Sequence, residues 1–392
     1  MKGLTPFVTR LSSRRILRVR GVDAHDFLQG MFTNDLRELH PAGSLYGCFL
    51  YFTGRVLCDA HLYQCRLVHD GQSSILVDVH ESSVALLLDH LVEMKMRKKV
   101  QIDDAGKELV VLAALEEHTP TPLADAASPC SNGRDDGRCI GSATEATKAS
   151  LEERHTECFV DARNAVLFPP QPQQSPSSAT SETEDAATAT ISAPLLSPPP
   201  TPAAGAAVAT TPWLLRRCVV PATWAPPPSS DDAYTTLLHS RGIGEGPAVF
   251  RANKSLPFEG NIDFLGGVSF HKGCYVGQEL THRTHVMLVT RKRVVPLVFG
   301  PAAAATADTT ADITGTRPVA AGESLYSAAK ERIGEVMDVC GSAGVGLLRL
   351  RYVDKASRTV PGLQLKDGTP VSAHLPDWWP RKEVKKLLKN ND

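Results

Sequence analysis

The segment of the chain best suited to chemistry is Lys272–Glu279, which reads KGCYVGQE. It places Cys274 between two glycines, Gly273 and Gly277, beside a lysine and a tyrosine. Glycine lets a backbone or a ligand approach closely, and a neighbouring ammonium group favours the thiolate, the reactive form of cysteine. We therefore expect a reactive or ligand-facing loop on a rigid scaffold, with Cys274 as its working group.

The chemistry open to Cys274 is limited by its surroundings in the sequence. No sequence rule supplies a base partner, so a hydrolase nucleophile is not supported. One thiolate cannot hold an iron–sulfur cluster alone, because a cluster usually takes four protein ligands. Cys274 could instead share a cluster across a partner interface or exchange one transiently. A redox thiol and a small buried structural cysteine are the remaining alternatives.

Histidines near this loop raise the question of a metal site. Together with Cys274, His271, His282 and His285 offer four potential ligands, but their spacing matches no common zinc finger. If His282 and His285 lie on a strand or loop, their rings need not converge. We expect exposed or hydrogen-bonded histidines and no stably bound metal, with a zinc-bearing interaction module as an alternative.

Composition bounds the class of protein. A chain of 392 residues suggests about two or three domains. Lys+Arg is 42 and Asp+Glu is 43, so the net charge of −1 argues against a nucleic-acid-binding surface. No run of roughly 18 apolar residues exists, and we expect no membrane insertion. The nine scattered cysteines lack a Cys-x-x-Cys pair and fit a reducing compartment better than a disulfide framework.

The N-terminus is basic. The first twenty residues hold six lysines and arginines, and no acidic residue occurs before Asp23. This pattern predicts a short organellar transit peptide with cleavage near residue ten, and hence import into mitochondria. The alternative is that Arg14–Gly21 forms the first strand of the fold, and both can hold.

Three segments interrupt the globular pattern. Residues 116–150 are polar and rich in Gly, Ala, Thr and Asp, residues 169–210 consist mostly of Pro, Ala, Ser and Thr, and residues 301–318 are rich in Ala and Thr. Such segments bury too little apolar surface to offset the entropy of ordering them. We expect all three to be disordered insertions.

The remaining segments predict an α+β fold. Helices are expected over Asp23–Met31 and Ser82–Lys95, where apolar residues recur at helical spacing. The strands expected in the same half are Arg14–Gly21, Tyr46–Tyr51, Val56–Tyr63, Ser74–Val79, Lys99–Asp103 and Glu108–Ala113. The later strands Lys292–Phe299, Glu331–Val339 and Gly344–Tyr352 fit a small β-barrel or sandwich. Arg381–Lys389 is expected as a basic helical turn on the surface.

Several motifs resemble the folate-binding aminomethyltransferase-like fold, and in particular YgfZ and its mitochondrial counterparts, the Iba57-type iron–sulfur cluster assembly factors. The segments that carry the resemblance are Gly21–Gly30, Thr33–Asp35, Gly54–Asp59, Leu256–Phe264, Val268–His285 and Arg291–Pro296. Without the insertions, it covers nearly the whole chain. The chain departs from the family at Asp161-Ala162-Arg163, where Asp-Pro-Arg is usual, and this departure is expected to affect only a surface loop.

The resemblance implies a ring of three domains around a channel that holds a reduced folate. The implied parts are a discontinuous domain 1 (residues 1–48 and 211–285), a ferredoxin-like α+β domain 2 (49–168), a linker (169–210), a C-terminal β-barrel (286–380) and a basic tail (381–392).

The resemblance also implies a function. It is the maturation of [4Fe–4S] proteins in the mitochondrial matrix, with A-type scaffold proteins and client apoproteins as partners and tetrahydrofolate as cofactor. A folate-dependent one-carbon, aminomethyl-type transferase is the alternative. Whether the chain catalyses a reaction is left open, with an assembly factor preferred to an enzyme.

The resemblance further assigns candidate ligand-binding residues. Glu259 would accept paired hydrogen bonds from a pterin ring, or would lie in a surface ion pair. Arg283 and Lys272 would meet glutamyl carboxylates, or cover a surface. Asn34 and Asp35 would line the cavity, although a helix cap is favoured for them. The loop residues Tyr275, Gln278 and Glu279 complete the set, the last two as anchors of the loop.

Overall fold

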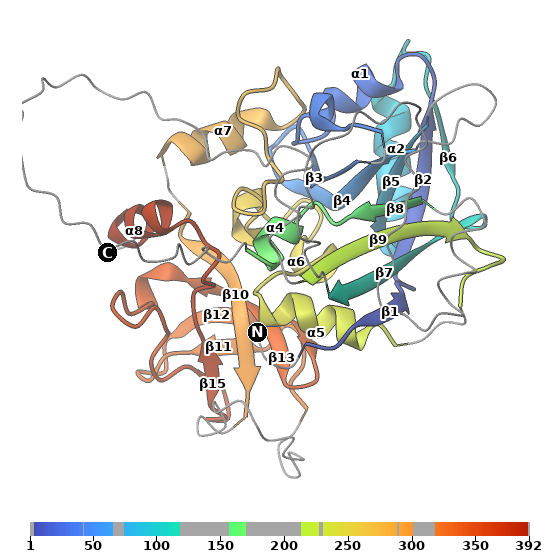
Figure 1. Ribbon diagram of the computed structural model, residues 1–392. Coiled ribbons are helices and arrows are strands. Elements are labelled where there is room, and N and C mark those ends of the chain that lie inside the picture. Colours follow the sequence, from blue (N-terminus) through green and yellow to red (C-terminus); the bar gives the residue numbers. More distant parts are fainter. Residues whose placement is uncertain are drawn as a thin grey trace, which may run out of the picture.

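The computed structural model describes residues 4–41, 43–65, 74–117, 157–169, 213–226, 230–287, 290–300 and 318–390. The three segments expected to be disordered insertions lie almost wholly outside these ranges. Figure 1 shows that the described parts form three sheets, with the C-terminal sheet below the two others.

A five-stranded antiparallel sheet is built from the N-terminal quarter of the chain. Its strands, in order across the sheet, are β3 (Ser44–Leu50), β4 (Val56–Gln64), β5 (Ser74–His80), β2 (Arg14–Arg20) and β6 (Gln101–Asp104). The helices α1 (Ala24–Gln29) and α2 (Val84–Met94) pack on one face through Phe27, Leu28, Leu87 and Leu91. These strands and helices agree with the expected ones, because each has a clear local pattern of apolar residues. The boundary expected between residues 48 and 49 falls inside β3.

A four-stranded antiparallel sheet covers the other face of the first. Its strands, in order, are β1 (Phe7–Arg10), β7 (Leu109–Glu117), β9 (Trp213–Pro221) and β8 (Glu157–Val160). Ile16 and Tyr63 of the first sheet share an apolar core with Val111 and Leu215 of the second.

The strand expected over Arg14–Gly21 is present as β2, but it is not the first strand of the chain. Phe7 pairs with Leu115 and Arg10 with Leu112, so β1 precedes it in the chain. Cleavage near residue ten would remove β1 from the sheet. The transit peptide itself stays a prediction.

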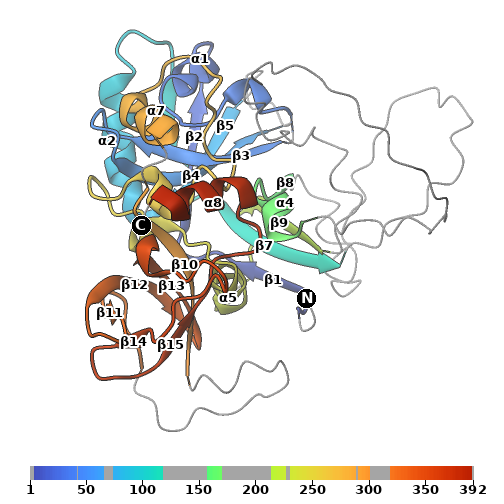
Figure 2. The same cartoon turned by 90° about the vertical axis from the view of Figure 1, so that its left-hand side faces the viewer.

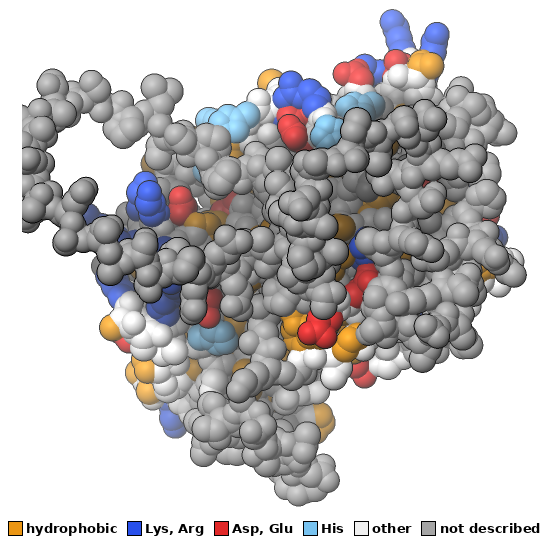
Figure 3. Space-filling model, viewed as in Figure 1, with side chains coloured by type: hydrophobic (Ala, Val, Ile, Leu, Met, Phe, Trp, Pro, Cys, Tyr) orange, Lys and Arg blue, Asp and Glu red, His pale blue; other side chains and the backbone are white. Residues whose placement is uncertain are grey.

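The C-terminal sheet has six antiparallel strands and is nearly closed into a barrel. In order they are β14 (Gln364–Leu365), β11 (Ser324–Tyr326), β12 (Arg332–Cys340), β13 (Ala343–Arg349), β10 (Lys292–Phe299) and β15 (Val371–Ala373). The helix α8 (Arg381–Asn390) follows it. Val384, Leu387 and Leu388 recur at helical spacing and join the barrel core beside Trp379. The expected surface turn is thus a helix that covers the barrel, and Figure 3 shows basic side chains gathered around its exposed side.

The remaining helices are mostly short, and Figure 2 shows α4, α5 and α7 from the side. These remaining helices are η1 (Leu36–Glu38), η2 (Glu81–Ser83), α4 (Asn164–Leu167), α5 (Asp232–Ser240), α6 (Gly246–Val249), η4 (Pro257–Gly260), α7 (Gln278–Met287) and η6 (Leu350–Tyr352). No helix in the described ranges is long and apolar enough to cross a membrane.

A buried ion network joins the two upper sheets. Arg217 of β9 contacts Asp78 of β5 at 2.7 Å, and Arg163 contacts Asp161 at 2.8 Å and Glu245 at 2.7 Å. Burial would raise the pKa of Glu245, but Arg163 and Arg217 hold it well below its usual value. Ala162, the position that departs from the family, is exposed as expected, but Asp161 and Arg163 on either side of it are buried, so residues 161–163 are not wholly a surface loop. The cause is this set of ion pairs with distant parts of the chain.

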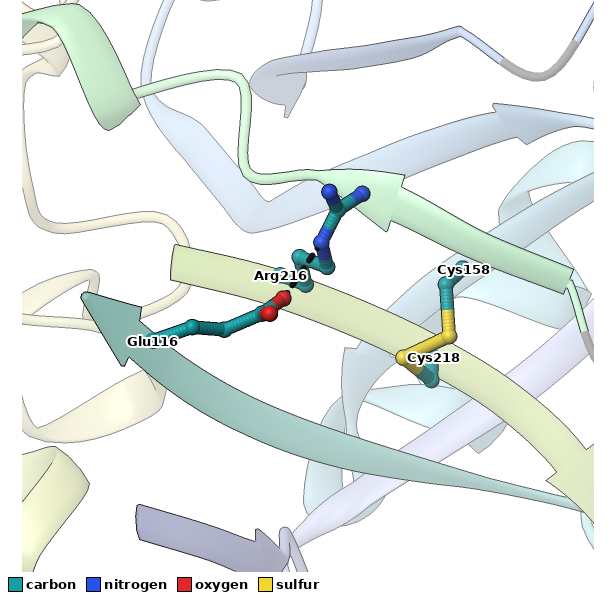
Figure 4. The surroundings of a disulfide bond; sticks show 4 residues. All are labelled: Glu116, Cys158, Arg216 and Cys218. Carbon is teal, nitrogen blue, oxygen red and sulfur yellow. Dashed lines mark hydrogen bonds and ion pairs between the residues drawn. A yellow bond between two sulfur atoms is a disulfide. The ribbon is translucent and has the colours of Figure 1, made fainter. Parts of the chain in front are cut away.

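Two cysteines are joined in a disulfide that the scattered cysteine pattern did not indicate. Cys158 of β8 and Cys218 of β9 form it (Figure 4), and they are 60 positions apart in the sequence. The described cysteines without a disulfide are Cys48, Cys58, Cys65, Cys274 and Cys340.

Candidate functional site

The loop that carries Cys274 lies along the segment that follows α1. The amide of Ser269 donates to the carbonyl of Thr33 at 3.1 Å, and the amide of Val276 donates to the carbonyl of Gly30 at 3.0 Å. These two bonds hold the loop at both ends against the segment between α1 and η1. The rigid scaffold expected for the loop is therefore α1 and the chain that follows it.

Lys272 fastens the middle of this loop. Its ammonium group donates to the carbonyl oxygens of Gln29 at 2.6 Å, Phe32 at 2.7 Å and Asn34 at 2.8 Å. These acceptors use all three of its N–H donors. The residue is only 6% exposed, and burial lowers its pKa to about 8. Lys272 therefore acts as a clamp on the loop, and its ammonium donors are already occupied by the protein.

Cys274 is an exposed free thiol two residues beyond this clamp. A Cβ added at Gly273 would meet nothing within 4 Å, so the space before the thiol is open. Gly277 differs, because its φ is +77° and a Cβ there would lie 2.4 Å from the carbonyl oxygen of Tyr51. One glycine leaves Cys274 accessible, and the other lets the loop pack on the β3–β4 turn.

Asn34 and Asp35 shape the segment that Lys272 grips. The Asp35 carboxylate accepts from the Arg37 amide at 3.1 Å and so caps η1. Its hydrogen bonds with the Arg37 side chain hold the pKa of Asp35 well below its usual value. The Asn34 amide donates to the carbonyls of Tyr46 and Gly266. The cap interpretation holds for Asp35, while Asn34 ties two distant segments together.

The chain after the loop forms α7, which the sequence did not indicate. His282 and His285 lie on this helix and not on the strand or loop that was considered for them, and the ring of His285 stacks on Phe270 with centroids 3.6 Å apart. Within the described ranges, no group of three or more His, Cys, Asp or Glu side chains is placed to hold a metal ion.

An open hollow of 720 Å³ lies beside α7. It brings four of the expected site residues together, and its lining consists of Phe52, Tyr275, Gly277, Gln278, Glu279, His282, Arg283, Val286 and Met287. Burial raises the pKa of Tyr275 to about 12, so its hydroxyl is neutral. Glu279 and Arg283 are exposed and pair with each other at 2.8 Å along the helix. The Gln278 side chain accepts from the Tyr275 amide at 3.4 Å, which ties the helix start to the loop.

The hollow is bordered by apolar side chains that face solvent. Phe52, at the tip of the β3–β4 hairpin, is 84% exposed, and Val286 and Met287 of α7 are 65% and 61% exposed. Large apolar groups gathered on a surface are typical of an interaction site.

Glu259 lies in a different pocket, of 230 Å³. It is the last residue but one of η4, and its carboxylate accepts from the Leu256 amide at 3.2 Å. Arg291 and Lys292 line the same pocket. The sequence reading assigned the basic role to Lys272 and Arg283, and the structure places two other basic residues beside Glu259. The sequence indicates the run Arg291–Pro296 only as part of the family resemblance.

Comparison with known proteins defines the class of fold. A family model for the CAF17 C-terminal beta-barrel domain matches residues 291–381. The crystal structure of glycine cleavage system aminomethyltransferase T from Bartonella henselae matches with a TM-score of 0.58 at 11% identity, covering 95% of this chain and 86% of that one. The protein is therefore an α+β member of the aminomethyltransferase-like fold with a C-terminal barrel, as its motifs implied.

Relatives of known name identify the family within this fold. The protein named "Iron-sulfur cluster assembly factor IBA57, mitochondrial" in Mus musculus is 31% identical over 385 residues, which are 95% of this chain and 85% of that protein. The protein of the same name in Homo sapiens is 29% identical over 381 residues, with the same coverage. The chain belongs to the IBA57 family of mitochondrial iron–sulfur cluster assembly factors.

Proposed function

We propose that the protein matures [4Fe–4S] proteins in the mitochondrial matrix by offering Cys274 as one ligand to a cluster shared with a partner. The observation that carries this proposal is the exposed free thiol on a loop that three carbonyl contacts of Lys272 hold in place. A thiol that only filled space would be buried. A thiol held at the surface on an immobilised loop can present its sulfur to another molecule in a fixed direction.

The number of ligands that a cluster needs indicates what kind of partner is required. A cluster usually takes four protein ligands, and the described residues gather no second set of metal-ligating groups around Cys274. We therefore assign the other ligands to a second molecule. We assign that role to an A-type scaffold protein, whose cysteines would hold the cluster with Cys274 before it passes to a client apoprotein.

The hollow that Tyr275, the residue after Cys274, helps to line suits such a partner. Phe52, Val286 and Met287 expose apolar groups that a docked protein would cover. The neighbouring Glu279 and Arg283 are charged and exposed, like the polar rim that usually surrounds an apolar contact. A partner that covers this patch would place its own thiolates near the loop.

We further propose that the Glu259 pocket holds the ring of tetrahydrofolate. One oxygen of Glu259 caps η4, and its second oxygen is an acceptor suited to ring N–H groups. Arg291 and Lys292 line the same pocket and suit the carboxylates of the folate tail. The volume of 230 Å³ is below the range of about 300–1,000 Å³ typical of ligand pockets, so the tail would extend beyond it. A bound folate would supply a carrier for a one-carbon unit.

The fold itself favours a second candidate function, a folate-dependent one-carbon transferase, because the matched solved structure is an aminomethyltransferase. The exposed Cys274 has no evident part in such a transfer. Production of methylene-tetrahydrofolate by the purified protein would establish this second function.

The proposed cluster sharing is tested by mixing the purified chain with an A-type scaffold protein loaded with a cluster. We expect the visible absorbance of the cluster to travel with a complex of both proteins on gel filtration. Cys274→Ser should abolish the coloured complex. The control Cys340→Ser, which changes a half-buried thiol 66 positions after Cys274, should leave it intact. A coloured complex of normal yield with Cys274→Ser would overturn the proposal.

A further inference from the structure

Cys158 and Cys218 occupy directly opposed positions in the β8–β9 pair. Their Cα atoms are 4.0 Å apart, close to the spacing of opposed residues that share no backbone hydrogen bonds, where side chains approach each other most closely. Figure 4 shows the two side chains meeting between neighbouring strands, with the Glu116–Arg216 ion pair nearby. The register of the strands alone brings the sulfur atoms together.

The two cysteines differ in their access to solvent. Cys218 is buried, whereas Cys158 is half-buried on β8. β8 lies at the end of the strand order and pairs only with β9 among the described strands. A small thiol reagent therefore reaches the sulfur of Cys158 first, and Cys218 lies behind it as the resolving thiol.

We propose that Cys158 and Cys218 form a reversible thiol–disulfide exchange site that takes small disulfides of the glutathione class. In oxidation, the Cys158 thiolate attacks one sulfur of glutathione disulfide, whose S–S bond breaks, and one glutathione thiolate leaves. The Cys218 thiolate then attacks the Cys158 sulfur and releases the second glutathione. The protein loses two electrons and two protons, and one glutathione disulfide becomes two glutathione molecules. Reduction reverses both steps.

The exchange site controls how firmly β8 is joined to its sheet. β8 has four residues, Glu157–Val160. The chain then enters the buried ion network at Asp161 and Arg163. The oxidised form adds a covalent bond to the contacts that hold β8. The reduced form relies on those contacts alone: the pairing with β9, the buried side chain of Phe159 and the hydrogen bond from the Ser44 hydroxyl to the Val160 carbonyl. Short, weakly held elements open locally without global unfolding. In the reduced form, β8 should therefore separate locally from β9, while the buried ion network keeps the rest of the chain folded.

The chemistry is tested with the full chain and two variants, Cys158→Ser/Cys218→Ser and the control Cys65→Ser, which removes a half-buried free thiol. Each is equilibrated with mixtures of glutathione and glutathione disulfide and then alkylated. We expect the parent chain and Cys65→Ser to lose two thiols together as the disulfide fraction rises, and to regain them in millimolar glutathione. The double variant should show no such two-thiol step, and peptide mapping should find Cys158 linked to Cys218. Thiols that stay free in excess glutathione disulfide, or a bond that glutathione never opens, would overturn the proposal.

The structural consequence is tested by amide hydrogen exchange. Reduction should speed exchange in residues 157–160 at least threefold in the parent chain, and the double variant should already exchange at the faster rate. Strand β6, an edge strand without cysteine, is the internal reference and should not change. Equal exchange of β8 in both redox forms would refute the control of β8 by this site.

Discussion

Replacing Lys272 by methionine tests the clamp that positions Cys274. Methionine keeps the apolar stem and removes the ammonium group, so the carbonyls of Gln29, Phe32 and Asn34 lose a donor. A buried polar group without a partner costs about 1–3 kcal/mol. The bond to Phe32 is buried and the other two are partly buried, where water can replace part of the loss. Together they predict a loss of about 3–5 kcal/mol, a large share of the roughly 5–15 kcal/mol that stabilises a typical domain.

The loss can be measured by urea unfolding, with fluorescence as the probe. With a slope of about 3 kcal/mol per molar urea, the midpoint should fall by about 1–1.7 M. Lys254→Met, at an exposed lysine, is the matched control and should shift the midpoint by less than about 0.2 M. Lys272→Arg keeps the positive charge, and its unfolding midpoint should lie between those of Lys272→Met and Lys254→Met. If Lys272→Met unfolded at the midpoint of the parent chain, the clamp would not be the element that holds the loop.

Three further changes give distinct results. Burial lowers the pKa of His61 to about 4. Between pH 6.5 and 4, His61 is therefore protonated in the unfolded chain and neutral in the folded chain. The free energy of unfolding falls by up to about 3 kcal/mol as the pH drops through this window. Denaturant unfolding of His61→Gln should show a shallower fall, and an unchanged pH slope would contradict this. Glu259→Gln should weaken tetrahydrofolate binding about tenfold in calorimetry, with folding changed by less than about 1 kcal/mol; equal affinity would remove Glu259 from the site. Phe52→Asp should weaken partner binding while stability stays within about 0.5 kcal/mol, and unchanged binding would place the partner elsewhere.

Features set by neighbouring residues could be predicted from the sequence. The hairpin β3–β4 and the helix α2 each show their pattern within about a dozen residues, and both were expected. The octapeptide around Cys274 could be singled out by its composition, and the structure places this thiol at the surface of a fixed loop.

Features set by distant contacts could not be predicted in this way. Lys272 and Gln29 are 243 positions apart, so nothing in the local sequence shows that the lysine grips the end of α1. The buried state of Arg163 depends on Glu245 in the same manner. The helix α7 is polar around most of its surface, and so it gave no apolar periodicity to detect.

The central claim is that Cys274 is the group through which this protein matures [4Fe–4S] enzymes. The most direct measurement is complementation of cells that lack their own IBA57-family protein, with aconitase-type activity as the readout and the level of the introduced chain measured alongside. We predict that the parent chain and Cys340→Ser restore the activity and that Cys274→Ser, present at the same level, does not. Full activity with Cys274→Ser would contradict the account.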